Sequence, residues 1–359
     1  RDIDIQRREN DVVLATFGRG FYVLDDYTAL RAMTKKTLDS AAVIFPVRDG
    51  LLYVQARHRG KGALGETFFT APNPPFGATF TYYVKEAPRT KKSVRKEAMK
   101  EKGDAAVYPS WDSLRAEDEE IEPYFSFLIR DAQGQPVRRL RSAVGSGVQR
   151  ITWDARFATL APITAGSEVN SAAGMPVPPG AYSVTMFAVV DGVEQQLAGP
   201  QPFTLRPLDI GTFPPSDPAA LAAFRRDLAE VQGRVLATQR ALREARERLA
   251  VLDKRLQIVP GSDAAQRADH LALRTQLNRL HREMNGDESI SSRNGNQLPS
   301  IIERVQDIVY SQWSHGGDPL PQHRIGLEHV RALIAPVHEA VSTISTRTLP
   351  ELERRLGGE

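Results

Sequence analysis

The chain opens with two short runs of apolar residues. Apolar residues dominate 12–15 and 21–24, and Phe17-Gly-Arg-Gly20 separates the two runs. Glycine adopts backbone angles that other residues resist, so this pattern predicts a β-hairpin. A lone hairpin is marginally stable at best and needs further strands beside it. Only the polar stretch 1–10 precedes the hairpin, so we expect the chain to be the C-terminal part of a longer polypeptide.

Residues 31–75 predict a connecting segment. A short turn or helix at 28–33 and a brief apolar run at 41–47 come before a loop at 57–65 that is rich in Gly and Arg. Prolines at 72, 74 and 75 mark a linker.

Residues 76–207 predict a β-sandwich, because many short strands bounded by Gly and Pro favour a sandwich over a barrel. Asp191-Gly192 is a strong hairpin turn, and Trp153 is the expected core anchor. The expected strands are 79–84, 124–129, 137–140, 149–153, 181–187 and 194–197.

Residues 88–122 interrupt this pattern with a helical insertion. The stretch 91–102 is rich in Lys and Glu, and an acidic run at 117–122 follows Trp111 and Leu114. We expect a solvated helical flap over a sheet edge, held by Trp111 and Leu114. A basic docking site for an acidic surface is the alternative, although nearby acids weaken its field.

Residues 208–359 show a helical period. Apolar residues recur at alternating steps of three and four, which places one stripe along a single long helix. Ser216 or Asp217 caps this helix, Pro218 lies in its first turn, and Pro260-Gly261 ends it. The stripe consists of Leu221, Phe224, Leu228, Val231, Val235, Thr238, Leu242, Ala245, Leu249, Leu252 and Leu256.

Three more amphipathic segments follow the long helix. They carry apolar residues at 273–284, at 298–313 and at 327–356, and Pro336 predicts a kink in the last one. The third segment is expected to bury Leu298, Ile302, Val305, Val309 and Trp313. Modest loops between the segments favour an intramolecular antiparallel bundle over a dimeric coiled coil. A homodimer through the stripe stays open as the alternative.

The composition of the chain excludes several classes of partner and of functional site. The net charge of +3 is small and spread along the chain, which argues against a nucleic-acid partner. The absence of Cys excludes disulfides, thiolate metal sites and cysteine nucleophiles. No run reaches the ~18 apolar residues that a membrane span needs.

Catalytic patterns are missing from the sequence. No two of the seven His are spaced i, i+4, and neither a G-x-S-x-G elbow nor a Walker loop is present. His58-Arg-Gly-Lys-Gly62 lacks the spacing of a phosphate loop, and the adjacent Asp25 and Asp26 point apart at a strand end. We therefore predict no catalytic residue, no metal ligand and no cofactor.

Thr16-Phe-Gly-Arg-Gly-Phe-Tyr-Val-Leu-Asp-Asp26 resembles the blade motif of sortilin-like and BNR-repeat β-propellers, which in bacteria often carry a glycosyl hydrolase label. Later stretches look like the segment that follows the propeller in large exported bacterial members. These stretches are 73–83, 111–115, 150–154, 179–182 and 300–305.

The resemblance implies a parent with a signal peptide and one or two propellers, exported to the periplasm or cell surface. It implies four regions: the last blade fragment (1–30), the connecting segment (31–75), an immunoglobulin- or fibronectin-like β-sandwich (76–207, insertion 88–122) and an antiparallel helical bundle (208–359). At most one blade is present, so the central-face residues of sialidases and xyloglucan-degrading relatives cannot be carried over.

Two functions remain as hypotheses. The first is a non-catalytic assembly or ligand-presenting module, with the upstream propeller of the same polypeptide as its partner, and a polysaccharide or another exported protein as a further one. The second is the accessory region of a glycoside hydrolase whose catalytic propeller lies upstream. Tyr82, Tyr83 and Trp111 are the candidate aromatic residues for stacking on sugar rings or contacting a partner.

Overall fold

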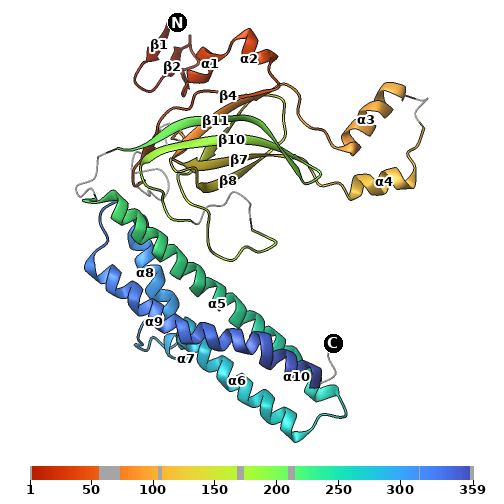
Figure 1. Cartoon of the computed structure of the whole chain (residues 1–359), viewed down its shortest axis with the longest axis vertical. Helices are drawn as coiled ribbons and strands as arrows, with labels where there is room; N and C mark the ends of the chain where they lie inside the picture. The colour runs from red at the N-terminus through yellow and green to blue at the C-terminus, as the bar shows by residue number, and fades with distance from the viewer. Residues whose placement is uncertain are drawn as a thin grey trace. The chain divides into compact units, whose positions relative to one another are not determined.

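The computed structural model of this chain describes residues 2–55, 73–103, 107–167, 174–208, 215–314 and 316–355. It contains both helices and strands, with small sheets and one sheet that curls into half a barrel (Figure 1). The chain divides into two compact units, the first holding most residues up to Ile210 and the second most residues from Gly211 onward. Residues 159–167 and 174–176 belong to the second unit. The predicted loop at 57–65 lies outside the described residues.

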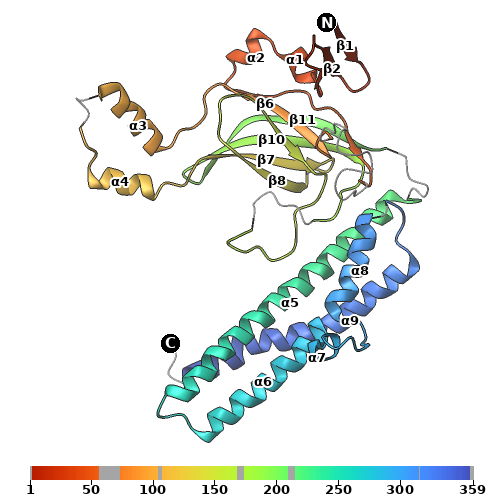
Figure 2. The ribbon, with the colours of Figure 1, turned by 180° about the vertical axis from the view of Figure 1, so that it is seen from behind.

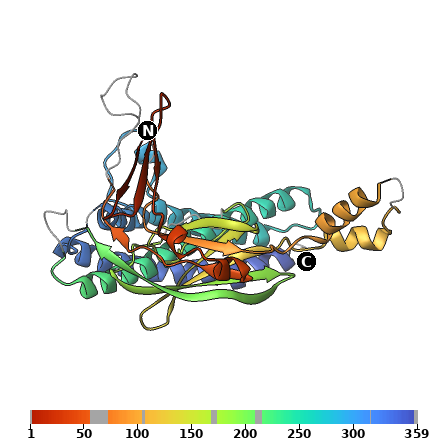
Figure 3. The same cartoon turned by 90° about the horizontal axis from the view of Figure 1, so that it is seen from above.

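The N-terminal sheet is an antiparallel meander of β1 (Asp2–Gln6), β2 (Asp11–Ala15) and β3 (Phe21–Leu24) (Figure 3). The predicted hairpin is confirmed, since Val12 pairs with Leu24 and Ala15 with Phe21. Gly18 and Gly20 in its turn have φ of 71° and 77°, which explains the need for glycine. The expectation that residues 1–10 only lead into the hairpin is wrong, because Ile3 and Ile5 alternate with acids and form β1.

Two further sheets make up the rest of the first unit. One has five strands in the order β5-β11-β10-β7-β8, and the other has three in the order β4-β6-β9. Asp191-Gly192 joins β10 to β11 with positive φ at both residues, as predicted. The strands are β4 (Ala42–Ile44), β5 (Gly50–Leu52), β6 (Ala78–Val84), β7 (Tyr124–Asp131), β8 (Pro136–Ala143), β9 (Gly147–Trp153), β10 (Gly180–Val190) and β11 (Val193–Pro207).

Side chains from both of these sheets share one apolar core. Trp153 lies fully buried in it, as expected, and its Nε1 donates to the Arg156 carbonyl at 2.9 Å. The Trp153 ring meets Tyr182 and Phe203 edge-on, at centroid distances of 5.4 and 6.0 Å. Two short helices, α1 (Thr28–Ala32) and α2 (Lys35–Asp39), precede β4.

The insertion forms two helices, α3 (Lys91–Lys102) and α4 (Trp111–Asp118). The prediction that Trp111 holds this segment onto a sheet is wrong, because 72% of Trp111 is exposed. Leu114 is half-buried. The two helices contact each other instead, side by side in Figure 2.

The second unit is helical. Its first element, α5 (Pro218–Ile258), runs for 41 residues, and all eleven residues of the predicted stripe are buried. Asp217 caps it by accepting from the backbone N–H groups of Ala219 and Ala220. The other helices are α6 (Ala264–Asn285), α7 (Glu288–Ser291), α8 (Ile301–Ser314), α9 (Pro321–Thr343) and α10 (Leu349–Arg355).

Two details of the helical prediction differ from the structure. Val305 and Val309 are buried and Ile302 and Trp313 pack against the core as predicted, but Leu298 precedes α8 and is exposed. Pro336 lies inside α9, and the change to π-helical hydrogen bonding comes later, at Ile344–Thr348.

A substitution at Leu228 tests how much the buried stripe of α5 stabilises the helical unit. It is fully buried on α5, so Leu228→Ala removes apolar contacts and leaves a cavity. We expect the free energy of unfolding of the helical unit to fall by about 2–5 kcal/mol, measured by urea denaturation with far-UV circular dichroism. Val251→Ala, on the exposed side of the same helix, is expected to stay within about 0.5 kcal/mol of the wild type. Equal effects of the two substitutions would contradict this assignment of the core face.

Candidate functional site

Tyr82 is not available to a ligand. The side chain is fully buried on β6, and its hydroxyl donates to Oε1 of Gln149 at 2.8 Å. Its ring lies 4.9 Å from that of Phe127 between centroids. Burial raises the pKa of the Tyr82 phenol, which a hydrogen bond to Ser142 partly offsets. The expectation that Tyr82 is exposed is therefore wrong.

Tyr83 and Trp111 are accessible, but they do not form one site with Tyr82. Tyr83 follows Tyr82 on the strand, so the two side chains point to opposite faces of β6. The Tyr83 hydroxyl donates to the Leu38 carbonyl at 3.1 Å, which fixes the ring against α2. Trp111 is the first residue of α4 in the insertion.

The N-terminal sheet is the most unusual surface of the first unit. Not one residue of β1, β2 or β3 is buried. All four residues of β3 are exposed, with Phe21 at 78% and Val23 at 58%. Phe21 and Val23 share one face of the strand, and Tyr22 and Leu24 share the other. β3 thus exposes apolar side chains on both faces of this small sheet, while Asp2 and Asp4 of β1 share the face of Phe21 and Val23.

Polar contacts tie this sheet to its neighbours. Arg150 on β9 donates through Nη2 to the carbonyls of Asp25 and Asp26, at 3.1 and 2.8 Å. The Tyr27 N–H donates to the Asn10 carbonyl at 2.8 Å. Asp25 and Asp26 therefore belong to a strand-end turn, as predicted, and apolar packing contributes little to holding the sheet.

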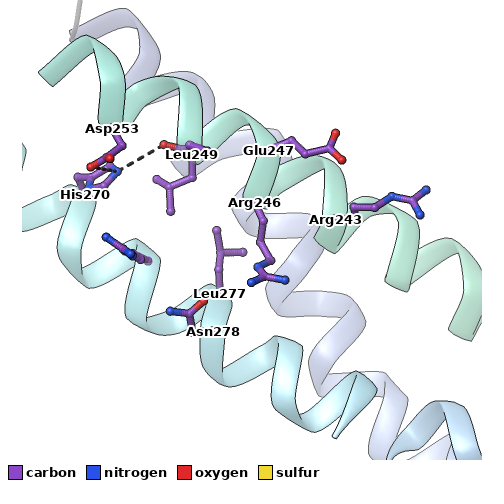
Figure 4. A pocket seen from close by; sticks show the side chains of 10 residues that line it. Arg243, Arg246, Glu247, Leu249, Asp253, His270, Leu277 and Asn278 are labelled. Carbon is purple, nitrogen blue, oxygen red and sulfur yellow. Dashed lines mark hydrogen bonds and ion pairs between the residues drawn. The ribbon is translucent and has the colours of Figure 1, made fainter. Parts of the chain in front are cut away.

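A groove in the second unit lies between α5 and α6 (Figure 4). This α5–α6 groove encloses about 440 Å³ and has Leu249, Ala250 and Leu277 in its lining. Its polar lining residues are Arg243, Arg246, Glu247, Asp253, His270, Arg274 and Asn278.

The electrostatics of the groove suit the binding of an anionic group. Arg243 and Arg274 form no ion pair with other described residues, so their charges face solvent. Arg246 donates through Nη1 to Nδ1 of His281 at 2.9 Å, and that imidazole is therefore neutral. Burial, helped by the Arg246 charge, lowers the pKa of His281. Because this imidazole is neutral, it does not cancel the charge of Arg246.

The α5–α6 groove is less suited to proton transfer than to the binding of an anionic group. His270 is buried, and its Nε2 lies 3.4 Å from the Leu249 carbonyl, to which it donates. The same nitrogen lies 3.8 Å from the Asp253 carboxylate. His281 has its Nδ1 occupied by Arg246, so both imidazoles serve the packing of α5 against α6. The sequence pattern did not reveal the groove, because its arginines flank the stripe and look like a solvated helix face.

Metal clusters and membrane-spanning helices are both lacking among the described residues. There, no group of three or more His, Cys, Asp or Glu is placed to hold a metal ion. Within the same ranges, every helix is too short or too polar to cross a membrane. His58 and His315 lie outside the described residues.

His281 predicts a pH dependence. Its pKa is lower in the folded state than in the unfolded chain, so the unfolded state binds the proton more readily. Stability is therefore complete above about pH 6.5 and falls as the pH drops through this value toward the folded pKa. We expect His281→Gln to flatten the decline in urea midpoint between pH 8 and pH 5.5, roughly the range in which an ordinary His titrates. His329→Gln, at an exposed position of α9, should keep the wild-type slope; an unchanged slope in His281→Gln would contradict the assignment.

Comparison with known proteins identifies no family. No protein-family model matches the chain, and no curated protein matches it.

Proposed function

We propose that this chain is the non-catalytic C-terminal assembly module of an exported β-propeller protein of the sortilin-like or BNR-repeat type. The observation that carries the proposal is the N-terminal sheet, which exposes apolar side chains on both of its faces. An exposed apolar surface of this kind marks an interaction site. A blade of a propeller is covered on both faces by its neighbouring blades, so this sheet suits a place in such a stack.

Strand number and motif position support the same proposal. Propeller blades have four strands, and the N-terminal sheet has three in a meander. Among the described residues, the outer edges of β1 and β3 are unpaired and open to a further strand. The stretch 16–26, which resembles the blade motif, forms the β2–β3 turn and β3 itself. The upstream propeller of the same polypeptide is thus the proposed partner.

We also propose that the chain contains a β-sandwich followed by an antiparallel helical bundle. The core shared by the five-stranded and three-stranded sheets supports an immunoglobulin- or fibronectin-like sandwich between 76 and 207, to which the predicted connecting segment adds β4 and β5. Contacts of α5 with α6, α8 and α9, joined by short connections, support an antiparallel bundle after residue 208. Export to the periplasm or cell surface follows from the resemblance alone.

The N-terminal sheet provides the test. The substitutions Phe21→Ser and Val23→Thr are made together in this chain and in the longer polypeptide that its gene is proposed to encode. In this chain we expect a stability change within about 0.5 kcal/mol, because both side chains are exposed. In the longer polypeptide we expect a loss of about 2 kcal/mol or more, because neighbouring blades bury them.

Leu30→Ser on α1, outside the sheet, is the matched control and should change neither protein appreciably. Equally small effects of the double substitution in both proteins would contradict the proposal, as would a gene that encodes no blades before this chain.

The α5–α6 groove favours a second candidate function, the accessory region of a glycoside hydrolase whose catalytic propeller lies upstream. Arg243 and Arg274 offer guanidinium groups without ion pairs to described residues, and guanidinium groups bind carboxylates in a bidentate geometry. A polysaccharide that carries carboxylates is the ligand class that fits this groove.

Affinity electrophoresis tests this second candidate. We expect alginate, an acidic polysaccharide, to retard the chain and neutral dextran to leave it unaffected. Replacing Arg243 and Arg274 with Ser should abolish the retardation, whereas replacing the exposed Arg226 and Arg347 with Ser removes the same charge and should not. Equal retardation of both double variants, or none by alginate, would exclude the groove as a glycan site.

A further inference from the structure

The insertion forms an arm whose helices are not covered by the other described residues of the first unit. The arm consists of α3, α4 and the described residues around them, and neither helix has a single buried residue. The helices have 12 and 8 residues, lengths at which an isolated helix is marginal in water. The arm therefore needs stabilising contacts beyond its own helical propensity.

Internal contacts of the arm are polar and fix its direction. Arg95 on α3 binds Glu117 on α4 through two hydrogen bonds, of 2.5 and 2.8 Å. The Lys91 N–H at the start of α3 donates to the Glu120 carboxylate just after α4. The start of α3 thus lies at the end of α4, and the two helices are antiparallel (Figure 2). The Arg95–Glu117 ion pair is partly buried, with side-chain exposures of 24% and 6%, so it holds α3 against α4.

Large apolar side chains of the arm face solvent. Tyr108 and Trp111 are 71% and 72% exposed, and Val107 beside them is exposed as well. Val94 on α3 and Ile121 after α4 add to this surface. Tyr and Trp are the residues that most often dominate binding energy at protein interfaces. This composition is that of an interface rather than of a solvated flap.

The two sides of the arm carry opposite charges. Helix α3 holds six Lys or Arg against two Glu, and the stretch 111–122 holds six Asp or Glu against one Arg. Lys100 and Lys102, at the free end of the arm, form no ion pair with described residues. Asp118 and Glu119, at the opposite end, form none with described residues either.

We propose that the arm is a homodimerisation surface, in which the arms of two copies pack so that the C-terminal end of α3 in each copy meets the C-terminal end of α4 in the other. Lys100 and Lys102 of each copy then lie opposite Asp118 and Glu119 of the other, with Tyr108 and Trp111 covered between the arms. A two-fold axis forms each of these contacts twice. The inference does not depend on the proposed function.

A second copy fits this arm better than a partner of one charge. An anionic lipid surface or an acidic protein attracts α3 but repels the acidic residues of α4. Only a partner that carries both signs in the reverse order satisfies the two helices together. A second copy of the same arm has this arrangement by symmetry.

Two charge reversals test the proposal. One variant carries Lys100→Glu and Lys102→Glu, and the other carries Asp118→Lys and Glu119→Lys. Each variant alone places like charges opposite each other, so we expect the wild type to sediment as a dimer at micromolar concentration and both variants as monomers. An equimolar mixture of the two variants restores both attractive contacts, so we expect it to sediment as a dimer again.

Control variants distinguish the arm from the rest of the protein surface. Lys35→Glu with Lys36→Glu, on α2, reverses two charges outside the arm and should leave the dimer intact. Tyr108→Ala with Trp111→Ala should weaken dimerisation about tenfold or more, and high salt should weaken it as well. Circular dichroism of each variant shows whether the helices persist.

Several results would overturn the proposal. These are a monomeric wild type, variants that dimerise as the wild type does, and a mixture that stays monomeric while its helices persist. Binding of a monomeric wild type to vesicles that contain phosphatidylserine, lost in the Lys100→Glu, Lys102→Glu variant, would assign the arm to membranes instead.

Discussion

An amphipathic element is stable only where something covers its apolar face, and this constraint organises the whole chain. Helix α5 meets it through contacts with α6, α8 and α9 along a length of about 60 Å. Phe80 on β6 and Phe203 on β11 show the same principle, because their rings meet in the core that two sheets share. In these regions the chain supplies both sides of every apolar contact.

Two regions of the first unit do not meet this constraint within the described residues. The N-terminal sheet exposes apolar side chains on both faces, and the arm exposes Tyr108 and Trp111 beside two helices without a buried residue. We attribute the first to a place between sheets and the second to a second copy of the arm. The chemistry differs because the exposed strand β3 is entirely apolar, whereas the arm combines apolar residues with two blocks of opposite charge.

The sequence predicts an element well where its apolar pattern is regular and where the helices or strands that pack against it belong to the same chain. The stripe on α5 is long and unbroken, so its period alone identifies eleven of the fourteen buried positions of this helix, all except Ala222, Arg225 and Gly233. Sequence reasoning failed at Tyr82 and Trp111, because residue type does not reveal which face of a strand is buried or whether a helix has a neighbour. It missed β1, where only Ile3 and Ile5 mark the alternation. The α5–α6 groove was hidden for a similar reason, since its shape depends on how two helices meet.

The central claim is that the N-terminal sheet is incomplete without further sheet on both of its faces. Hydrogen exchange at the backbone amides of β2 and β3 tests it most directly, because exchange reports local opening. We expect fast exchange in this chain and strong protection in the longer polypeptide that the gene is proposed to encode. Equal exchange of these amides in both proteins would contradict it.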